Sequence, residues 1–212
     1  MKKLVIAFFI LIGIVQSQAQ VTFRPGINAG LNISKIQNTD LDSKTSFYIG
    51  GFGALKLSKF YTLQPEISYS RQGGKGSVTG YYIAYDDLGS PYSGYEEGNV
   101  ELTLNYISSV TINKFNLNKH LYLLVGPFVD ILVGSSTTAD SEHDFLNPIS
   151  KGEDIDFGII GGAGFYINKG FGLESRIKFG SRDAYDNHED SNTEINTNLV
   201  FQLGATYTFN VK

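Results

Sequence analysis

The stretch Leu63-Gln-Pro-Glu-Ile-Ser-Tyr-Ser-Arg-Gln-Gly73 alternates between apolar and polar side chains, yet it holds a proline and a glutamate near its middle. An alternation of period two is typical of a β-strand. Proline gives up a ladder hydrogen bond, so we expect a local bulge at Pro65. A glutamate that faces an enclosed interior needs a cationic partner, because burying an unpaired carboxylate is costly. The stretch therefore predicts a strand whose polar face, including Glu66, lines a closed interior.

The same alternation recurs along the chain and predicts eight strands. One face of each strand is aliphatic and aromatic, and the other mixes Gly, Ser, Thr, Asn and charged residues. We expect Ile27, Leu63, Leu123 and Phe201 on the outer face. The predicted strands span residues 22–34, 46–58, 60–72, 100–113, 120–134, 155–167, 170–180 and 197–210.

Short and long connections alternate between these strands. The short ones are 58–59, 116–119 and 168–170, and the long, polar ones are about 35–45, 73–99, 135–154 and 181–196. An even number of strands with this alternation is the layout of bacterial outer-membrane barrels. Backbone groups in hydrocarbon must pair within the protein, so the sheet has to close. Eight strands leave an interior just wide enough for side chains. We predict an all-β, eight-stranded antiparallel up-and-down transmembrane β-barrel over residues 20–212, with a lumen of small and polar side chains.

Residues 1–19 are typical of a cleavable signal peptide. Lys2 and Lys3 precede the apolar run Leu4–Val15, and Ser17 and Ala19 are the small residues of a cut after Ala19. The run is shorter than the roughly 20 residues that a spanning helix needs. Cleavage removes two of the 17 Lys and Arg residues against 21 Asp and Glu, so the exported chain is acidic, which argues against a nucleic-acid partner. The chain has no cysteine, which excludes disulfides and thiolate metal sites.

The predicted strand 170–180 supplies cations for the interior. Glu174, Arg176 and Lys178 share its inward face, and this strand lies across an eight-stranded barrel from Glu66. Glu66 and Arg176 stand at matching depths, so we predict an ion pair between them in the lumen. The expected ion-pair network comprises Glu66, Glu174, Arg176, Lys178, Asp130 and Arg71. Such a network could form a proton or ion path, or a plug that fills the barrel and fixes its register, and we favour the plug.

Five segments carry a family resemblance: LQPEISYSRQGGK (63–75), LYLLVGPFVDILVG (121–134), DFGIIGGAGF (156–165), LESRIKFG (173–180) and LVFQLGATYTF (199–209). They resemble the PorT-like outer-membrane β-barrel domain family of Bacteroidota, among the porin-family small barrels. Its most specific pieces are Gln64-Pro-Glu66 followed by Tyr69, Gly126-Pro127, and Glu174-x-Arg176. The resemblance spans essentially the whole mature chain and implies an eight-stranded outer-membrane barrel of Gram-negative bacteria. The family usually places a proline in its fourth strand, and residues 106–112 have none.

Aromatic residues gather near the predicted short turns, as in an interfacial girdle. They are Phe60, Tyr61, Phe115, Tyr122, Phe165, Tyr166 and Phe171. Each short turn also carries a lysine, namely Lys59, Lys119 and Lys169. These lysines either meet phosphate groups of the inner leaflet or solubilise the turns.

Two of the long loops hold candidate binding residues. Loop 73–99 is rich in tyrosine, a good contact residue for sugars or proteins. Alternatively, it is an extracellular hairpin that continues its flanking strands, with tyrosines that pack on each other. Loop 181–196 is acidic and could hold Ca²⁺, but it lacks the EF-hand glycine, so we expect a solvated loop and no metal site. The tyrosines are Tyr81, Tyr82, Tyr85, Tyr92 and Tyr95, and the acidic residues are Asp183, Asp186, Glu189, Asp190 and Glu194.

Catalysis finds little support in the sequence. The histidines are His120, His143 and His188, and no serine on the predicted strands has a histidine within reach. A hydroxyl needs an adjacent base to become a nucleophile. The segment GGAG (161–164) lies within a strand and so is not a phosphate cradle. We therefore expect no enzyme and no cofactor.

We expect an integral outer-membrane protein with periplasmic N- and C-termini and a structural, accessory or surface-interaction role. Its expected partners are outer-membrane lipid and lipopolysaccharide, together with a larger outer-membrane protein assembly. Two alternatives stay open: a secreted or periplasmic lipocalin-like ligand-binding barrel, and a barrel enzyme that modifies lipid A.

Overall fold

The computed structural model describes residues 22–140, 150–151, 153–186 and 196–210. The signal peptide expected at residues 1–19 lies outside this part of the chain. Within it, no helix is long and apolar enough to cross a membrane.

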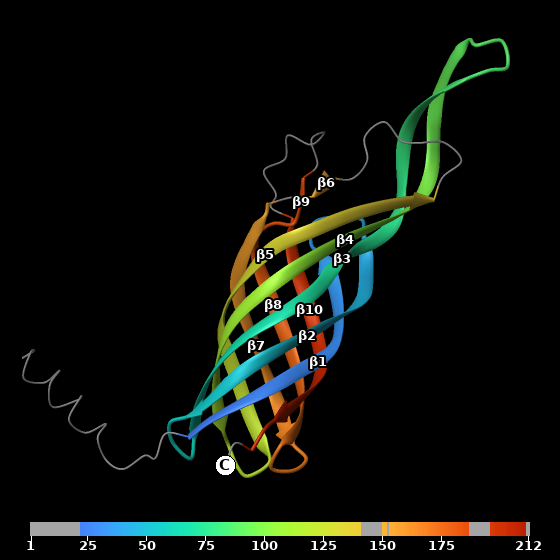
Figure 1. Cartoon of the computed structure of the whole chain (residues 1–212). Helices are drawn as coiled ribbons and strands as arrows, with labels where there is room; N and C mark the ends of the chain where they lie inside the picture. Colours follow the sequence, from blue (N-terminus) through green and yellow to red (C-terminus); the bar gives the residue numbers. More distant parts are fainter. Residues whose placement is uncertain (1–21, 141–149, 152, 187–195, 211–212) are drawn as a thin grey trace, which may run out of the picture.

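Eight long strands close into an antiparallel barrel (Figure 1). They are β1 (Thr22–Ile36), β2 (Asp42–Lys56), β3 (Tyr61–Tyr85), β4 (Pro91–Asn116), β5 (Leu121–Asp140), β7 (Ile155–Tyr166), β8 (Phe171–Asp183) and β10 (Thr197–Thr208). Each of these strands pairs with its neighbours along the chain, and β1 pairs with β10 to close the sheet. The short strands β6 (Ser150–Lys151) and β9 (Tyr185–Asp186) pair with each other outside the barrel. The predicted eight-stranded up-and-down barrel is confirmed.

Side chains alternate across the barrel wall as the sequence pattern predicted. On β1, Ile27 is 52% exposed, whereas Asn28 and Asn32 are buried. Leu123 is also exposed, and Leu63 and Phe201 are half-buried on the outer face. A soluble barrel encloses its apolar residues. An apolar outer surface of this extent needs a lipid environment, which argues against the lipocalin-like alternative.

Pro65 is accommodated by a gap in the ladder and not by a bulge. It pairs with Thr111 on the β4 side. On the β2 side the pairing is interrupted, yet the register is the same on both sides of the interruption. Proline has no N–H to donate, so a local loss of pairing with β2 is enough to accommodate Pro65. The bulge predicted at this residue is therefore wrong. The register of β2 and β3 shifts instead between Ser70 and Gly74, around Gly73, whose φ of 133° suits only glycine.

The predicted loop 73–99 is a β-hairpin. β3 and β4 stay paired out to Tyr85 and Pro91, and this ribbon projects well beyond the barrel (Figure 1). The Asp86 carboxylate closes the turn by accepting the N–H groups of Leu88 at 2.9 Å and Ser90 at 2.7 Å. Of the two readings of this segment, the hairpin that continues its strands is the one observed. The predicted boundaries were wrong because both faces of the ribbon are exposed or half-buried beyond the barrel, so polar and apolar residues do not alternate there.

The lumen is not uniformly polar. Two apolar clusters fill part of it, one of Ile36, Leu41, Leu102, Leu104, Tyr106 and Ala184, and the other of Val110, Ile112, Tyr122, Leu124, Phe128 and Ile160. Most of these residues come from β4 and β5. Conversely, β4 turns mostly polar residues outwards, namely Asn105, Ser109, Thr111 and Asn113. The expectation of a small, polar lumen is therefore wrong in this sector, because β4 presents its apolar side to the interior.

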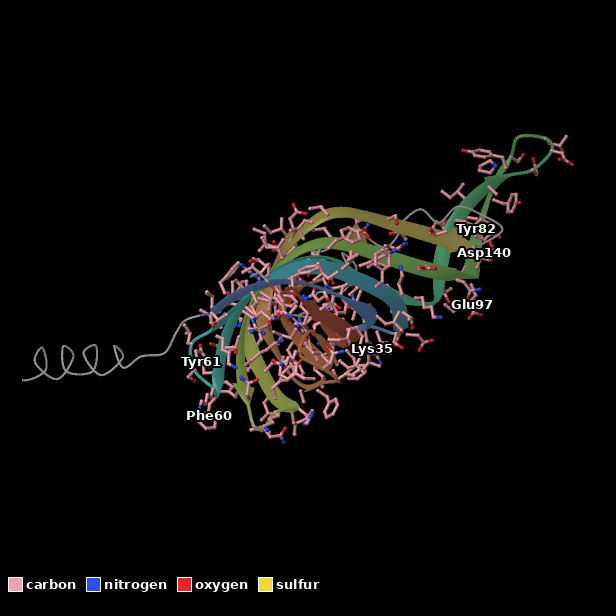
Figure 2. The ribbon with its side chains drawn as sticks, turned by 60° about the horizontal axis from the view of Figure 1, so that its bottom comes forward. Lys35, Phe60, Tyr61, Tyr82, Glu97 and Asp140 are labelled. Carbon is pink, nitrogen blue, oxygen red and sulfur yellow. The ribbon has the colours of Figure 1, made fainter. Side chains whose placement is uncertain are left out.

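Exposed aromatic rings surround the short-turn end of the barrel. Phe60, Phe115 and Phe165 are all at least 45% exposed, and Figure 2 shows Phe60 and Tyr61 at this end. Tyr122 does not belong to the predicted girdle: it shares the inward face of β5 and is fully buried. Tyr166 is half-buried, and its ring lies 4.4 Å from that of Tyr122.

Candidate functional site

The centre of the barrel holds a bidentate ion pair between Glu66 and Arg176. β3 and β8 lie opposite each other, with three strands between them in either direction around the ring. Arg176 donates from Nη1 to Glu66 Oε2 at 2.8 Å and from Nη2 to Glu66 Oε1 at 2.9 Å. Both side chains are almost completely buried. The structure thus brings together the pair expected from the sequence.

Further polar groups complete the bonding of Glu66. Asn28 donates to Glu66 Oε2 at 2.9 Å, and Gln64 donates to Glu66 Oε1 at 2.6 Å. Each carboxylate oxygen therefore accepts two hydrogen bonds. A buried carboxylate that is both paired and saturated in this way avoids the cost of an unsatisfied charge.

Glu174 forms a second charged layer, nearer the short turns. It accepts from Arg176 Nε at 2.7 Å, from Lys114 Nζ at 2.6 Å and from the Tyr122 hydroxyl at 2.6 Å. The Lys114 ammonium also lies 4.7 Å from the centre of the Tyr122 ring. Arg176 therefore bridges two carboxylates, and Lys114 balances the second one.

Lys178 and Asp130 form a third layer. Their Nζ–Oδ2 distance is 2.7 Å, and Lys178 also donates to Ser108 Oγ at 3.1 Å. Gln72 donates to Asp130 at 3.0 Å and accepts from Asn198 on β10. The three layers together cross-link strands on all sides of the bore.

Arg71 lies outside this network. Its position on β3 alternates with the inward-facing Ser70 and Gln72, so its side chain belongs to the outer face. The expected extension of the network to Arg71 is therefore wrong, because the period-two rule places residues 66 and 71 on opposite faces.

Lys114 and Tyr122 are network residues that the sequence reasoning missed, and Lys44 is a further buried cation that it missed. Lys114 and Lys44 lay just outside the predicted strands 100–113 and 46–58, and Tyr122 was assigned to the girdle. Continuing the alternation by a few residues would have placed both lysines inside. At the long-loop end, Lys44 contacts Glu101 at 2.9 Å. This hydrogen bond holds the pKa of Glu101 below its usual range.

A cavity of about 750 Å³ opens at the short-turn end; we call it the vestibule. Its inner limit is marked by Gln64 and Lys114, the partners of Glu66 and Glu174. The charged network therefore stands between this vestibule and the long-loop end. The lining comprises Arg24, Ala54, Lys56, Lys59, Phe60, Thr62, Gln64, Lys114, Asn116, Leu117, Asn118, Lys119, His120, Tyr166, Ile167, Asn168, Lys169, Thr206 and Thr208.

The five tyrosines predicted as a binding surface lie on the projecting β3–β4 hairpin. Tyr81 and Tyr95 pack with ring centres 5.3 Å apart, and Tyr82 and Tyr92 pack at 6.3 Å. Tyr85 is 70% exposed and Tyr95 is 77% exposed. In Figure 2, Tyr82 and Glu97 lie far from Phe60 and Tyr61, at the other end of the molecule. Four of the five tyrosines thus pack in two pairs, and the hairpin keeps exposed ring surface.

The remaining candidates are only partly described. His120 lies in the turn between β4 and β5, and its ring stacks on Phe165 at 5.6 Å. His143 and His188 lie outside the described residues, as do Glu189, Asp190 and Glu194 of the acidic loop. Asp183 ends β8 and Asp186 ends β9.

Comparisons with known proteins found several similar solved structures and one matching family model. The solved structures that are similar include Neisserial surface protein A (NspA), at 11% identity and a TM-score of 0.49, covering 88% of this chain and 97% of that one. Ail, the attachment invasion locus protein of Yersinia pestis, has 13% identity and a TM-score of 0.46, with coverage of 88% and 97%. OprG from Pseudomonas aeruginosa has 11% identity and a TM-score of 0.37, with coverage of 89% and 95%.

No curated protein matches the sequence. A family model does match, over residues 16–186, and its description is "Outer membrane protein beta-barrel domain". The match covers most of the chain and includes every barrel strand from β1 to β8. The chain therefore belongs to the outer-membrane protein β-barrel domain family, as an integral protein of the outer membrane.

Proposed function

We propose that this protein is a non-enzymatic outer-membrane barrel that presents its β3–β4 hairpin to a protein partner at the cell surface. In this proposal the lumen network is a structural plug, and the short turns and both termini face the periplasm. The observation that carries it is the combination of a bore crossed by saturated ion pairs with exposed tyrosines. These tyrosines lie on the β3–β4 ribbon, which projects well beyond the barrel (Figure 1).

The hairpin has the properties of a protein-binding element. Within the described residues, β2 pairs with β3 no further than Lys75, and β5 pairs with β4 no further than Asn99. Beyond these residues the hairpin is a two-stranded ribbon. Such a ribbon is marginally stable alone in water, and its edges can accept a strand of another chain. Its tyrosines supply a large contact area at low entropic cost.

The lumen supports a structural role. Its polar groups bond one another, which leaves the carboxylates of Glu66, Glu174 and Asp130 saturated and paired. A general acid or base needs a group that can reach the substrate. The motifs Gln64-Pro-Glu66, Gly126-Pro127 and Glu174-x-Arg176 further support a place in the PorT-like branch of the family.

Orientation can be tested with single cysteines, since the chain has none of its own. Leu88→Cys sits at the hairpin tip, where the leucine is 92% exposed, and Asn118→Cys sits in a short turn. A membrane-impermeant maleimide should label Leu88→Cys on intact cells, and Asn118→Cys only after the outer membrane is permeabilised. The reverse pattern would refute the proposed orientation.

Partner contact can be tested with a photo-crosslinking amino acid at Tyr95 in intact cells. We expect a discrete crosslinked protein species from this position. The matched control is Tyr207, an exposed tyrosine on the barrel wall at 46% exposure. A hairpin that crosslinks nothing, or that crosslinks the same species as Tyr207, would rule out the surface-contact role.

A further inference from the structure

The vestibule concentrates positive charge from all around the barrel mouth. Its lining includes no aspartate or glutamate. In the described part of the chain, no ion pair involves its cations other than Lys114. The cations are Arg24 from β1, Lys56 from β2, Lys114 from β4, and Lys59, Lys119 and Lys169 from the three short turns.

The three short turns hold their lysines by one repeated design. In each turn a side-chain oxygen accepts the backbone N–H groups two and three residues later, and the lysine follows that residue directly. Ser58 accepts from Phe60 and Tyr61 at 3.2 and 3.0 Å. Asn118 accepts from His120 and Leu121, both at 2.8 Å.

Asn168 repeats this pattern in the third turn, where it accepts from Gly170 at 2.9 Å and from Phe171 at 2.8 Å. Side-chain to backbone bonds of this kind fix a turn locally. Each turn therefore presents its lysine at the equivalent position, and all three lysines line the same cavity. This arrangement goes beyond what is needed to make a turn soluble.

The floor of the vestibule adds a buried cation and further donors. Lys114 is only 2% exposed and reaches the cavity from beside Glu174. In Asn118 and Asn168 the carbonyl oxygen is used by the turn, which leaves the NH₂ group to donate. Thr62, Thr206 and Thr208 add hydroxyl groups to the wall. The lining is thus rich in donors and cations.

This charge distribution suits a compact anion with more than one charge. A cleft lined by one sign of charge and walled by low-dielectric protein focuses its field and raises the local concentration of counter-ions. Lysine binds phosphate as a point charge, without the planar geometry that arginine imposes on a carboxylate. A volume of about 750 Å³ is within the range of small-molecule sites, roughly 300–1,000 Å³.

We propose that the vestibule binds a phosphate-bearing ligand, held by Lys59, Lys119 and Lys169 at the mouth and by Lys114 at the floor. The phosphate comes either from the headgroup of a lipid in the adjoining leaflet or from a soluble molecule. This site lies at the opposite end from the hairpin, so it goes beyond the proposed function and does not depend on it.

The test is the binding of inorganic pyrophosphate to the full chain in nanodiscs of phosphatidylcholine alone, followed by calorimetry. We expect the triple variant Lys59→Gln, Lys119→Gln, Lys169→Gln to bind at least tenfold more weakly than wild type. The matched control removes three exposed cations near the long-loop end by Lys35→Gln, Lys75→Gln and Arg182→Gln. This control should keep the wild-type affinity. Pyrophosphate binding that is lost equally in both variants, or unchanged in the triple variant, would overturn the proposal.

The source of the phosphate is decided by repeating the titration in nanodiscs that contain phosphatidylglycerol. If the lipid headgroup is the ligand, pyrophosphate binding weakens in proportion to the phosphatidylglycerol content. In the triple variant, phosphatidylglycerol then no longer affects pyrophosphate binding. If the ligand is soluble, the affinity for pyrophosphate is the same in both nanodiscs. An unboiled gel shift shows whether the triple variant and its control still fold.

Discussion

Arg176 is the residue on which the lumen network depends. It bonds both Glu66 and Glu174 in the middle of the bore, where all three side chains are buried. A buried ion pair adds little net stability compared with apolar residues of the same size, but removing one partner leaves the other charge buried and unpaired. A single substitution in the network should therefore lower the free energy of unfolding by much more than the net contribution of the network to stability suggests.

Arg176→Met should lower the free energy of unfolding by about 3–5 kcal/mol, because it leaves two carboxylates short of a cation. Urea unfolding of the barrel in phospholipid vesicles measures this. Lys35→Met is the control, since Lys35 is an exposed cation on β1, and its effect should stay within about 0.5 kcal/mol. Adding Glu66→Gln to Arg176→Met should recover part of the loss, and a strictly additive double variant would contradict the pairing.

Gly126 allows two strands to approach closely, and a side chain there is not tolerated. A Cβ at this position would lie 1.9 Å from the backbone oxygen of Thr111. We expect Gly126→Ala to cost about 1–3 kcal/mol through the backbone shift that it forces. Gly134→Ala is the control, because its nearest neighbour would be Asn105 Nδ2 at 3.7 Å. The folded fraction on unboiled gels after urea treatment compares the stability of the two variants. Equal folded fractions would show that the close contact at Gly126 does not limit stability.

At the scale of elements, β4 differs most from the simple pattern of a membrane barrel. Its inward face carries Tyr106, Val110 and Ile112, whereas Ser109 and Thr111 face outwards. The β4 side chains Asn105 and Asn113 accept hydrogen bonds at 2.7 Å from Tyr69 and Tyr61. These bonds satisfy part of the hydrogen-bonding capacity of the outward-facing polar residues of β4.

Thr111→Val should therefore stabilise the barrel in a bilayer. The substitution keeps the shape of the side chain and removes an exposed hydroxyl from the lipid-facing wall, which should raise the free energy of unfolding by about 0.5–2 kcal/mol. Thr138→Val, at the far end of β5, is the control and should have no such effect. Urea unfolding in vesicles provides the measurement. Destabilisation by Thr111→Val would mean that this hydroxyl has a partner in the membrane.

Alternation predicted the number and order of the strands but not their lengths. The apolar face of a strand such as β1 is visible because lipid requires it. The hairpin segments of β3 and β4 touch water on both faces, so nothing selects for alternation there, and the sequence reasoning assigned them to a loop. Lys44 and Lys114 were missed for a different reason: both are buried on the inner face, but each lies just beyond the end of a predicted strand.

For the molecule as a whole, the saturated network predicts a closed bore. Wild-type protein in a planar lipid bilayer should give no steady ionic conductance, because Glu66, Arg176 and Glu174 cross the lumen and bond each other. The Leu88→Cys variant is recorded alongside the wild type, and maleimide labelling of its single cysteine shows that the protein has inserted. A stable, reproducible conductance from labelled protein would show that the network is an ion path and not a plug.

The sequence by itself determined the closed eight-stranded barrel, because a chain that must pair its backbone in lipid leaves few other solutions for this alternation. It also indicated that Glu66 and Arg176 would meet, since strand order and depth follow from counting residues. Only the tertiary structure decided which polar residues join them, where Pro65 loses its ladder, and how β4 turns its apolar face inwards. The vestibule likewise could be found only from the tertiary structure. Its cations come from separate turns and strands, and no local pattern records that the closed ring brings them around one cavity.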